Sequence, residues 1–86
     1  MLSYAITFKR SASKELSKLP KRAVIRITDA IDGLAEEPRP RGCKKLRGLA
    51  DRYRIKIGDY RVVYSIEDDI LTVEILRIAD RKDAYR

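Results

Sequence analysis

The residues of this chain that could do chemistry are cations on one face of a predicted β-hairpin. Two alternating stretches, Arg52–Ile57 and Tyr60–Ile66, flank the pair Gly58-Asp59, which is a two-residue turn signal. In such a hairpin Lys56 lies opposite Arg61, and residues two apart on a strand share a face. The cationic face holds Arg52, Arg54, Lys56 and Arg61, with no acid among them. Opposed like charges destabilise a sheet, so this arrangement indicates a site for a polyanion.

The residue types that are missing narrow the chemistry further. The chain has no histidine, no Gly-rich phosphate loop, no cluster with metal-ligand spacing and no serine or cysteine with a basic partner. Lysine, arginine, tyrosine and scattered carboxylates remain. These suit cleavage of a phosphodiester by the RNA 2′-hydroxyl, which needs no metal and no covalent enzyme intermediate. We therefore expect no cofactor.

Lys56 is the best candidate for the base in such a reaction. An isolated lysine keeps its proton at neutral pH, but Arg54, Arg61 and Arg52 on the same face disfavour its charged form. Arg61 is the natural phosphate clamp, because its guanidinium stays charged and presents a fork of donors. Tyr85 could stack on a base or join a proton relay. The competing interpretation of Lys56 and Arg61 is an ordinary solvated strand face.

The positive charge of the chain is concentrated around the hairpin. The net charge is +7, and residues 39–61 alone carry nine basic and two acidic side chains. Besides the hairpin cations, this segment contains Arg39, Arg41, Lys44, Lys45 and Arg47. A concentrated patch indicates binding to nucleic acid, here by Arg54, Arg52, Lys44, Lys45 and Arg47. A solubilising surface is the alternative.

Length and composition predict one small domain, residues 1–86. The lone Cys43 cannot form an internal disulfide, and a free thiol fits a reducing compartment. No signal-like segment begins the chain and no apolar run is long enough to span a bilayer. We expect a soluble cytoplasmic protein that does not bind membranes.

The elements that must position the cations follow from hydrophobic periodicity. Residues 4–8 alternate as a short strand, and Ser11 is a plausible cap for a helix that ends near Pro20. Residues 21–37 repeat apolar side chains at helical spacing, and residues 70–79 are apolar enough for a central strand. The order β-α-α-β-β-β predicts an α+β fold, in which a mostly antiparallel four-stranded sheet packs against an N-terminal helical hairpin.

The motifs of this chain are similar to a known family. The stretches Lys45-Leu46-Arg47-Gly48, Tyr53 to Tyr64 and Asp80 to Arg86 resemble the RelE toxins of bacterial and archaeal toxin–antitoxin pairs over nearly the whole length. The resemblance implies a ribosome-dependent endoribonuclease that cuts messenger RNA in the decoding A site without a metal. It also implies partners: the 70S ribosome with its messenger, and a cognate antitoxin in an inhibitory complex of heterotetramer size or larger. DNA would be contacted only through the antitoxin.

The resemblance also implies a role for individual residues. Lys56 matches the family's proposed general base, Arg61 the arginine that stabilises the scissile phosphate, Arg81 the proposed general acid and Tyr85 the tyrosine that stacks on a messenger base. Arg54 stands where well-studied members have a second lysine. Ala79-Asp80 departs from the Gly-His or Gly-Lys of many relatives, which places an acid beside Arg81.

Two other functions remain open at this point. ParE-type toxins share the expected fold and inhibit DNA gyrase by binding, but they generally lack the lysine–arginine–tyrosine set. A non-catalytic RNA-binding module would explain the charge, and it would bind free RNA with a steep salt dependence. Cleavage that occurs only on the ribosome distinguishes the first hypothesis from both.

Overall fold

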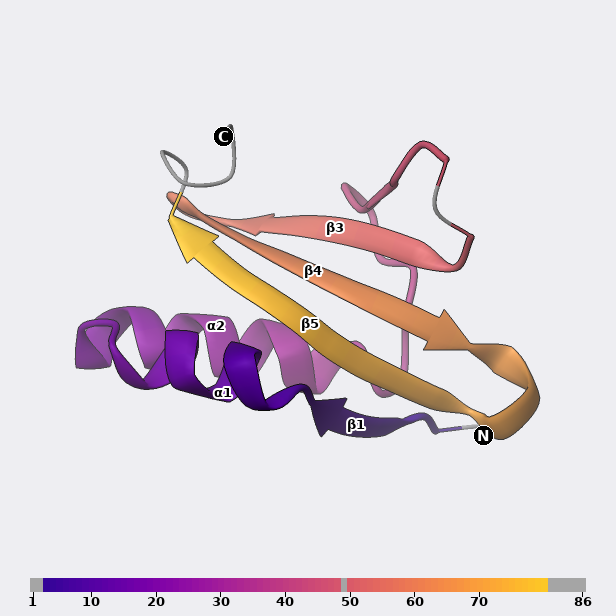
Figure 1. Cartoon of the computed structure of the whole chain (residues 1–86), viewed down its shortest axis with the longest axis horizontal. Coiled ribbons are helices and arrows are strands. Elements are labelled where there is room, and N and C mark those ends of the chain that lie inside the picture. Colours follow the sequence, from indigo (N-terminus) through magenta and orange to yellow (C-terminus); the bar gives the residue numbers. More distant parts are fainter. Residues whose placement is uncertain (1–2, 49, 81–86) are drawn as a thin grey trace.

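The computed structural model describes residues 3–48 and 50–80, which form a five-stranded sheet covered on one face by two helices (Figure 1). The sheet has the order β1-β5-β4-β3-β2, in which β1 runs parallel to β5 and every other pair is antiparallel. The elements are β1 (Ala5–Phe8), α1 (Arg10–Ser17), α2 (Lys21–Gly33), β2 (Lys44–Lys45), β3 (Arg52–Ile57), β4 (Tyr60–Glu67) and β5 (Thr72–Asp80), with a 3₁₀ turn at Asp68–Ile70. The predicted α+β class and the order of the main elements are confirmed.

The predicted hairpin is present in the predicted register. Ile57 pairs with Tyr60 and Lys56 pairs with Arg61. Gly58 has a φ of 59°, whereas Asp59 has no positive φ. A positive φ at only the first central residue is the pattern of a type II′ turn, which matches the twist of the two strands.

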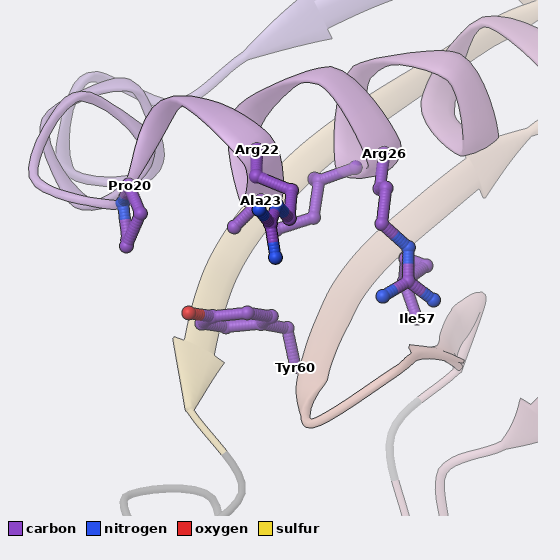
Figure 2. Close-up of a pocket in the computed structure, with 7 residues that line it drawn as sticks. Pro20, Arg22, Ala23, Arg26, Ile57 and Tyr60 are labelled. Carbon is purple, nitrogen blue, oxygen red and sulfur yellow. The ribbon is translucent and has the colours of Figure 1, made fainter.

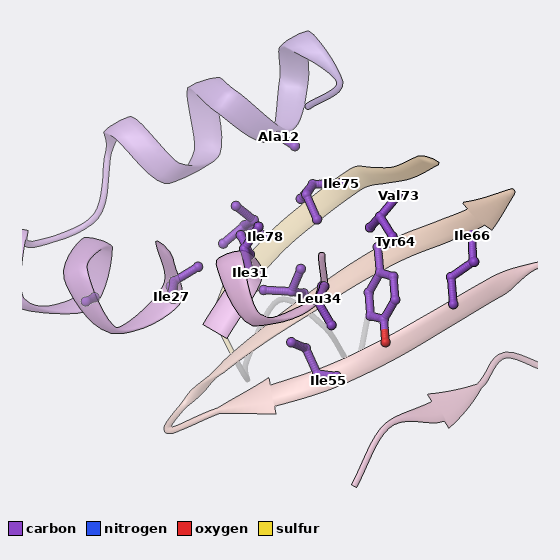
Figure 3. Packing of buried hydrophobic residues seen from close by; sticks show 12 residues of the cluster. Ala12, Ile27, Ile31, Leu34, Ile55, Tyr64, Ile66, Val73, Ile75 and Ile78 are labelled. Carbon is purple, nitrogen blue, oxygen red and sulfur yellow. The ribbon is translucent and has the colours of Figure 1, made fainter. Parts of the chain in front are cut away.

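The core lies between the helices and the face of the sheet that alternation predicted to be apolar (Figure 3). From β4 this face contributes Val62, Tyr64 and Ile66, each at most 1% exposed. Ile27 and Ile31 of α2 cover them, which is the consequence of apolar residues spaced four apart on one helix. Tyr53 stacks on Tyr64 and is half-buried; the other members of the core are Ala12, Ala23, Leu34, Ile55, Val73, Ile75 and Ile78.

Both predicted helix boundaries were wrong at one end. Ser11 is not a cap, because α1 already begins at Arg10 after an extended Lys9. No side chain caps this start, and the first turn instead packs against the core through the fully buried Ala12. α2 ends at Gly33 instead of continuing to Glu37, and its end tightens into shorter bonds such as Leu34 N–H to the Ile31 carbonyl.

The sheet has one strand more than expected. Lys44 and Lys45, which are not part of the four expected strands, pair with Arg54 and Tyr53 and form the two-residue edge strand β2. A pair of lysines has no strand signal, and only its partner strand makes it one. At the other end of the hairpin, β5 begins at Thr72 rather than residue 70, because Leu71 has a left-handed φ of 47° after the 3₁₀ turn.

The Tyr64 hydroxyl ties this core to the chain that follows α2. It donates a hydrogen bond of 2.7 Å to the Pro38 carbonyl, and both residues are buried. Tyr64→Phe should therefore destabilise the protein by about 1–2 kcal/mol, since it leaves a buried carbonyl without its donor. Urea unfolding measures this difference. Tyr60→Phe is the matched control, expected within about 0.5 kcal/mol of wild type; equal effects of the two changes would contradict the role of the Pro38 bond.

Candidate nucleic-acid interface

The face of the sheet opposite the helices carries a cluster of cations. Cross-strand partners share a face, so Lys44 of β2 joins Arg54, and Lys56 joins Arg61. Val63 pairs with both Arg54 and Arg77, which adds Arg77 of β5 to the same face. We call Lys44, Arg54, Lys56, Arg61 and Arg77 the basic cluster. Four adjacent strands contribute to it, and all of its members lie between the middle of the sheet and the hairpin turn.

A small pocket lies within the basic cluster. It has a volume of about 170 Å³, and its described lining consists of Leu46, Arg54, Arg61, Val63, Arg77 and Ala79. Three of these six side chains are arginines and none is an acid. Arg61 is 4% exposed, the only charged side chain that is buried among residues 3–48 and 50–80, whereas Lys56 opposite it is exposed. The arginine is therefore held in the floor of the site, and the lysine stands at its rim.

The opposite end of the same face is acidic. A second pocket there, of about 450 Å³, is lined by Ala50, Asp51, Arg52, Ser65, Ile66, Glu67, Asp68, Asp69 and Glu74. Arg52, predicted as a binding residue, pairs with Ser65 at this end and so lies among carboxylates, apart from the basic cluster. A polyanion is attracted to one end of this face and repelled from the other.

Arg39 does not add to the positive surface, because its charge is neutralised. Its guanidinium forms an ion pair of 3.0 Å with Asp68, donates a 3.1 Å hydrogen bond to the Tyr53 hydroxyl and lies over the Tyr53 ring. Tyr4 donates a 2.6 Å hydrogen bond to the same carboxylate. These two donors, Arg39 first, lower the pKa of Asp68 below its usual 3.8. The network of Tyr4, Arg39, Tyr53 and Asp68 thus attaches the chain that follows α2 to the sheet.

The remaining predicted residues divide between the two faces. Lys45 pairs with Tyr53, which puts it on the core-bearing face rather than in the basic cluster. Arg47 is exposed in the loop beyond Leu46, next to the pocket. The predicted site residues Arg81 and Tyr85 lie outside the described residues.

Arg77 is the member of the cluster that sequence reasoning missed. Val63 of β4 pairs with Arg77 of β5, but the next residue of β4, Tyr64, pairs with Ile75. Leu76 is therefore an extra, bulged residue on β5. The bulge lets Ile75 and Ile78 share the core and turns Arg77 to the other face. The sequence does hold a signal: strict alternation from Val73 and Ile75 would bury Arg77 and expose Ile78, a combination that a bulge resolves.

A third pocket lies on the helix side, between the start of α2 and the tip of the hairpin (Figure 2). It has a volume of about 440 Å³, and its lining is mostly apolar, with Arg22 and Arg26 at its edge. The Arg26 guanidinium rests against the hairpin turn, 3.1 Å from where a Cβ on Gly58 would stand. Among the described residues, this lining contains no carboxylate, and Tyr60 is the one residue in it that bears a hydroxyl.

Within residues 3–48 and 50–80, no three His, Cys, Asp or Glu side chains are grouped so as to hold a metal ion. None of the helices in this part of the chain is long and apolar enough to cross a membrane.

Comparison with known proteins identifies the class. The family model described as the ParE toxin of the type II toxin–antitoxin system parDE matches residues 6–85. Toxin RelG of Mycobacterium tuberculosis is 36% identical over 86 residues, which is 99% of each chain. The mRNA interferase toxin RelE of Escherichia coli is 30% identical over 83 residues, 94% of this chain and 86% of the relative. The archaeal RelE–RelB complex of Pyrococcus horikoshii matches with a TM-score of 0.83 and 34% identity, covering 92% of this chain and 96% of that chain.

The fold and these similarities define the toxin component of a type II toxin–antitoxin system. Within that class, the chain belongs to the RelE family of the RelE/ParE superfamily, as its sequence motifs predicted.

The network around Asp68 predicts a pH dependence of stability. Because the pKa of Asp68 is lowered in the folded protein, its ionised form contributes stability that is complete above its usual value of 3.8 and is lost as the pH falls below it. Asp68→Asn should lower the urea midpoint at pH 6, and the difference from wild type should shrink near pH 3. Unfolding curves at the two pH values measure this. A difference that stayed constant with pH would show that the carboxylate charge contributes nothing.

Proposed function

We propose that this chain is a ribosome-dependent endoribonuclease that cuts messenger RNA in the A site. The observation that supports this most strongly is the direct opposition of Lys56 and Arg61 beside a pocket lined by arginines. Cross-strand partners have Cα atoms about 4.5–5.5 Å apart, so the two side chains can act on one phosphodiester. The mRNA interferase name of a relative that aligns with 94% of this chain supports the same reaction.

In the proposed reaction the RNA supplies its own nucleophile. Lys56, as a neutral amine, takes the proton of the 2′-hydroxyl, and the 2′-oxygen attacks the adjacent phosphorus. Arg61 binds the non-bridging oxygens, whose negative charge rises in the transition state. The bond between phosphorus and the 5′-oxygen breaks, and Arg81 is proposed to donate a proton to that leaving oxygen. The products are a 2′,3′-cyclic phosphate and a 5′-hydroxyl, with no metal and no covalent enzyme intermediate.

Other residues are proposed to bind rather than react. Arg54 and Lys44, in the basic cluster, and the neighbouring Arg47 would hold the RNA backbone, and Tyr85 would stack on a base. The acidic end of the face keeps the strand over the hairpin end. The ribosome would present the codon with the 2′-oxygen in line with the scissile bond, which explains a dependence on ribosomes.

The partner that inhibits such an enzyme would be a cognate antitoxin that covers its basic surface. The solved relatives include complexes of RelE with RelB, which supports a partner of that kind. Both proteins would act in the cytoplasm, where ribosomes are translating.

The second candidate is inhibition of DNA gyrase without nuclease activity, and the match to a ParE family model favours it. In that case the Lys56–Arg61 opposition would have no chemical purpose. A supercoiling assay with purified gyrase tests this candidate directly.

Lys56→Ala should reduce single-turnover cleavage of ribosome-bound messenger by about 10²–10⁴-fold, because it removes the proton acceptor. Arg61→Ala should cost about 10²-fold or more, because the transition-state charge loses its donor. Primer extension on a defined messenger, with and without programmed 70S ribosomes, measures both changes.

Lys14→Ala, which removes an exposed cation of α1, is the matched control and should cut like wild type. Undiminished cleavage by Lys56→Ala would overturn the base assignment. Absence of any ribosome-dependent stop with wild-type protein, together with loss of supercoiling activity, would replace this function with gyrase inhibition.

A further inference from the structure

Arg77 occupies a position that the fold constructs specifically for it. The bulge at Leu76 gives β5 one residue more than β4 across this step, and only this extra residue moves Arg77 out of the core layer. Its side chain is half-exposed and lines the 170 Å³ pocket together with Arg54 and Arg61. A bulge that only relieved packing strain would not need an arginine at this point, directly beside two others.

Glu15 of α1 holds the bulged segment from the side. Among the described residues, β1 pairs with β5 only as far as Ile75, so the edge of β5 beyond it has no strand neighbour. One oxygen of the Glu15 carboxylate accepts a 2.8 Å hydrogen bond from the backbone N–H of Ile78. The other lies 3.9 Å from Nε of Arg77. A single carboxylate thus contacts the side chain of Arg77 and the backbone of Ile78, the two residues that follow the bulge.

The pocket itself indicates the ligand. Arg54, Arg61 and Arg77, from three neighbouring strands, all line it, so the positive charges of three side chains converge on one small space. Its volume of about 170 Å³ is several times the roughly 30 Å³ that one water occupies in the liquid, so a phosphate group fits. Arginine is also the side chain best suited to phosphate, because its planar fork donates two parallel hydrogen bonds.

We propose that Arg77 is a third phosphate-binding arginine, which holds the messenger backbone beside the scissile phosphate, and that Glu15 is its positioning residue. The identity of the polyanion rests on the proposed function. Arg77 takes no part in proton transfer, so its contribution is to binding. Its ion pair with Glu15 restrains the Arg77 side chain beside the pocket.

The test measures binding separately from cleavage. The probe is a 70S ribosome carrying a messenger with 2′-deoxy nucleotides in the A-site codon, which the enzyme cannot cut. Arg77→Ala should weaken binding by about tenfold and reduce the dependence of log affinity on log salt by about 0.7, the value for one phosphate contact on a single strand. Arg77→Lys should keep the salt dependence, because it keeps the charge. At saturating enzyme, Arg77→Ala should cut normal messenger within a few-fold of the wild-type rate.

A double-mutant cycle tests the role of Glu15. Glu15→Gln keeps an oxygen that can accept the Ile78 hydrogen bond and removes only the charge facing Arg77. It should weaken binding a few-fold in the wild-type background and have no effect in Arg77→Ala. Lys14→Ala is the neighbouring control and should leave affinity and salt dependence unchanged. Equal effects of Glu15→Gln in both backgrounds would show that Glu15 acts only on the fold.

The possible failures are distinguishable. If wild-type protein cuts messenger on ribosomes but Arg77→Ala keeps full affinity and an unchanged salt dependence, this proposal alone is overturned. If wild-type protein neither binds nor cuts on ribosomes, the proposed function is overturned, and this one with it. Thermal unfolding of each variant separates a lost contact from a lost fold, and Arg77→Gln serves if Arg77→Ala does not fold.

Discussion

The site depends on one constraint, which is that β4 must be apolar on one face and cationic on the other. Val62, Tyr64 and Ile66 are almost completely removed from water on the helix side. Burial of side chains this size contributes about 1.5–3 kcal/mol each, which exceeds the cost of placing like charges across one sheet position. Their packing also fixes the register, since a slip by one residue would exchange the two faces. The positions of Lys56 and Arg61 are therefore a consequence of the core beneath them.

The positions of the charges on the outer face, and not only the net charge, determine where this face is positive. Of the nine cations in residues 39–61, Arg39 is paired with Asp68 and Arg52 lies among carboxylates, so neither strengthens the field at the pocket. The basic cluster at the hairpin end thus owes its field to few residues. The basic end of this face attracts a polyanion and the acidic end repels it, so a bound polyanion would have a preferred position on this surface.

The sequence allowed prediction of the features that local patterns determine. The hairpin, its register and the apolar face all follow from alternation around Gly58-Asp59, and these features place Arg54, Lys56 and Arg61. The features that were missed depend on a partner in space. Lys44 and Lys45 become a strand only because β3 lies beside them, and Arg77 joins the site only through a bulge held by Glu15. Ser11 was mistaken for a cap, whereas no side chain caps this helix and its first turn packs against the core through Ala12.

The shared fold cannot decide between cleavage and gyrase inhibition, because the same scaffold supports both functions. The two functions differ in what they require of the outer face, because only cleavage requires groups placed to act together on one phosphate. A gyrase inhibitor needs complementary shape and charge, and exposed cations at many positions would provide that charge. Arg61 is instead only 4% exposed, so its side chain belongs to a small enclosed site rather than to a broad exposed surface. A guanidinium held this deep, with a lysine at the rim opposite it and two more arginines beside it, favours a site that binds one phosphate group tightly over a surface that binds a partner broadly.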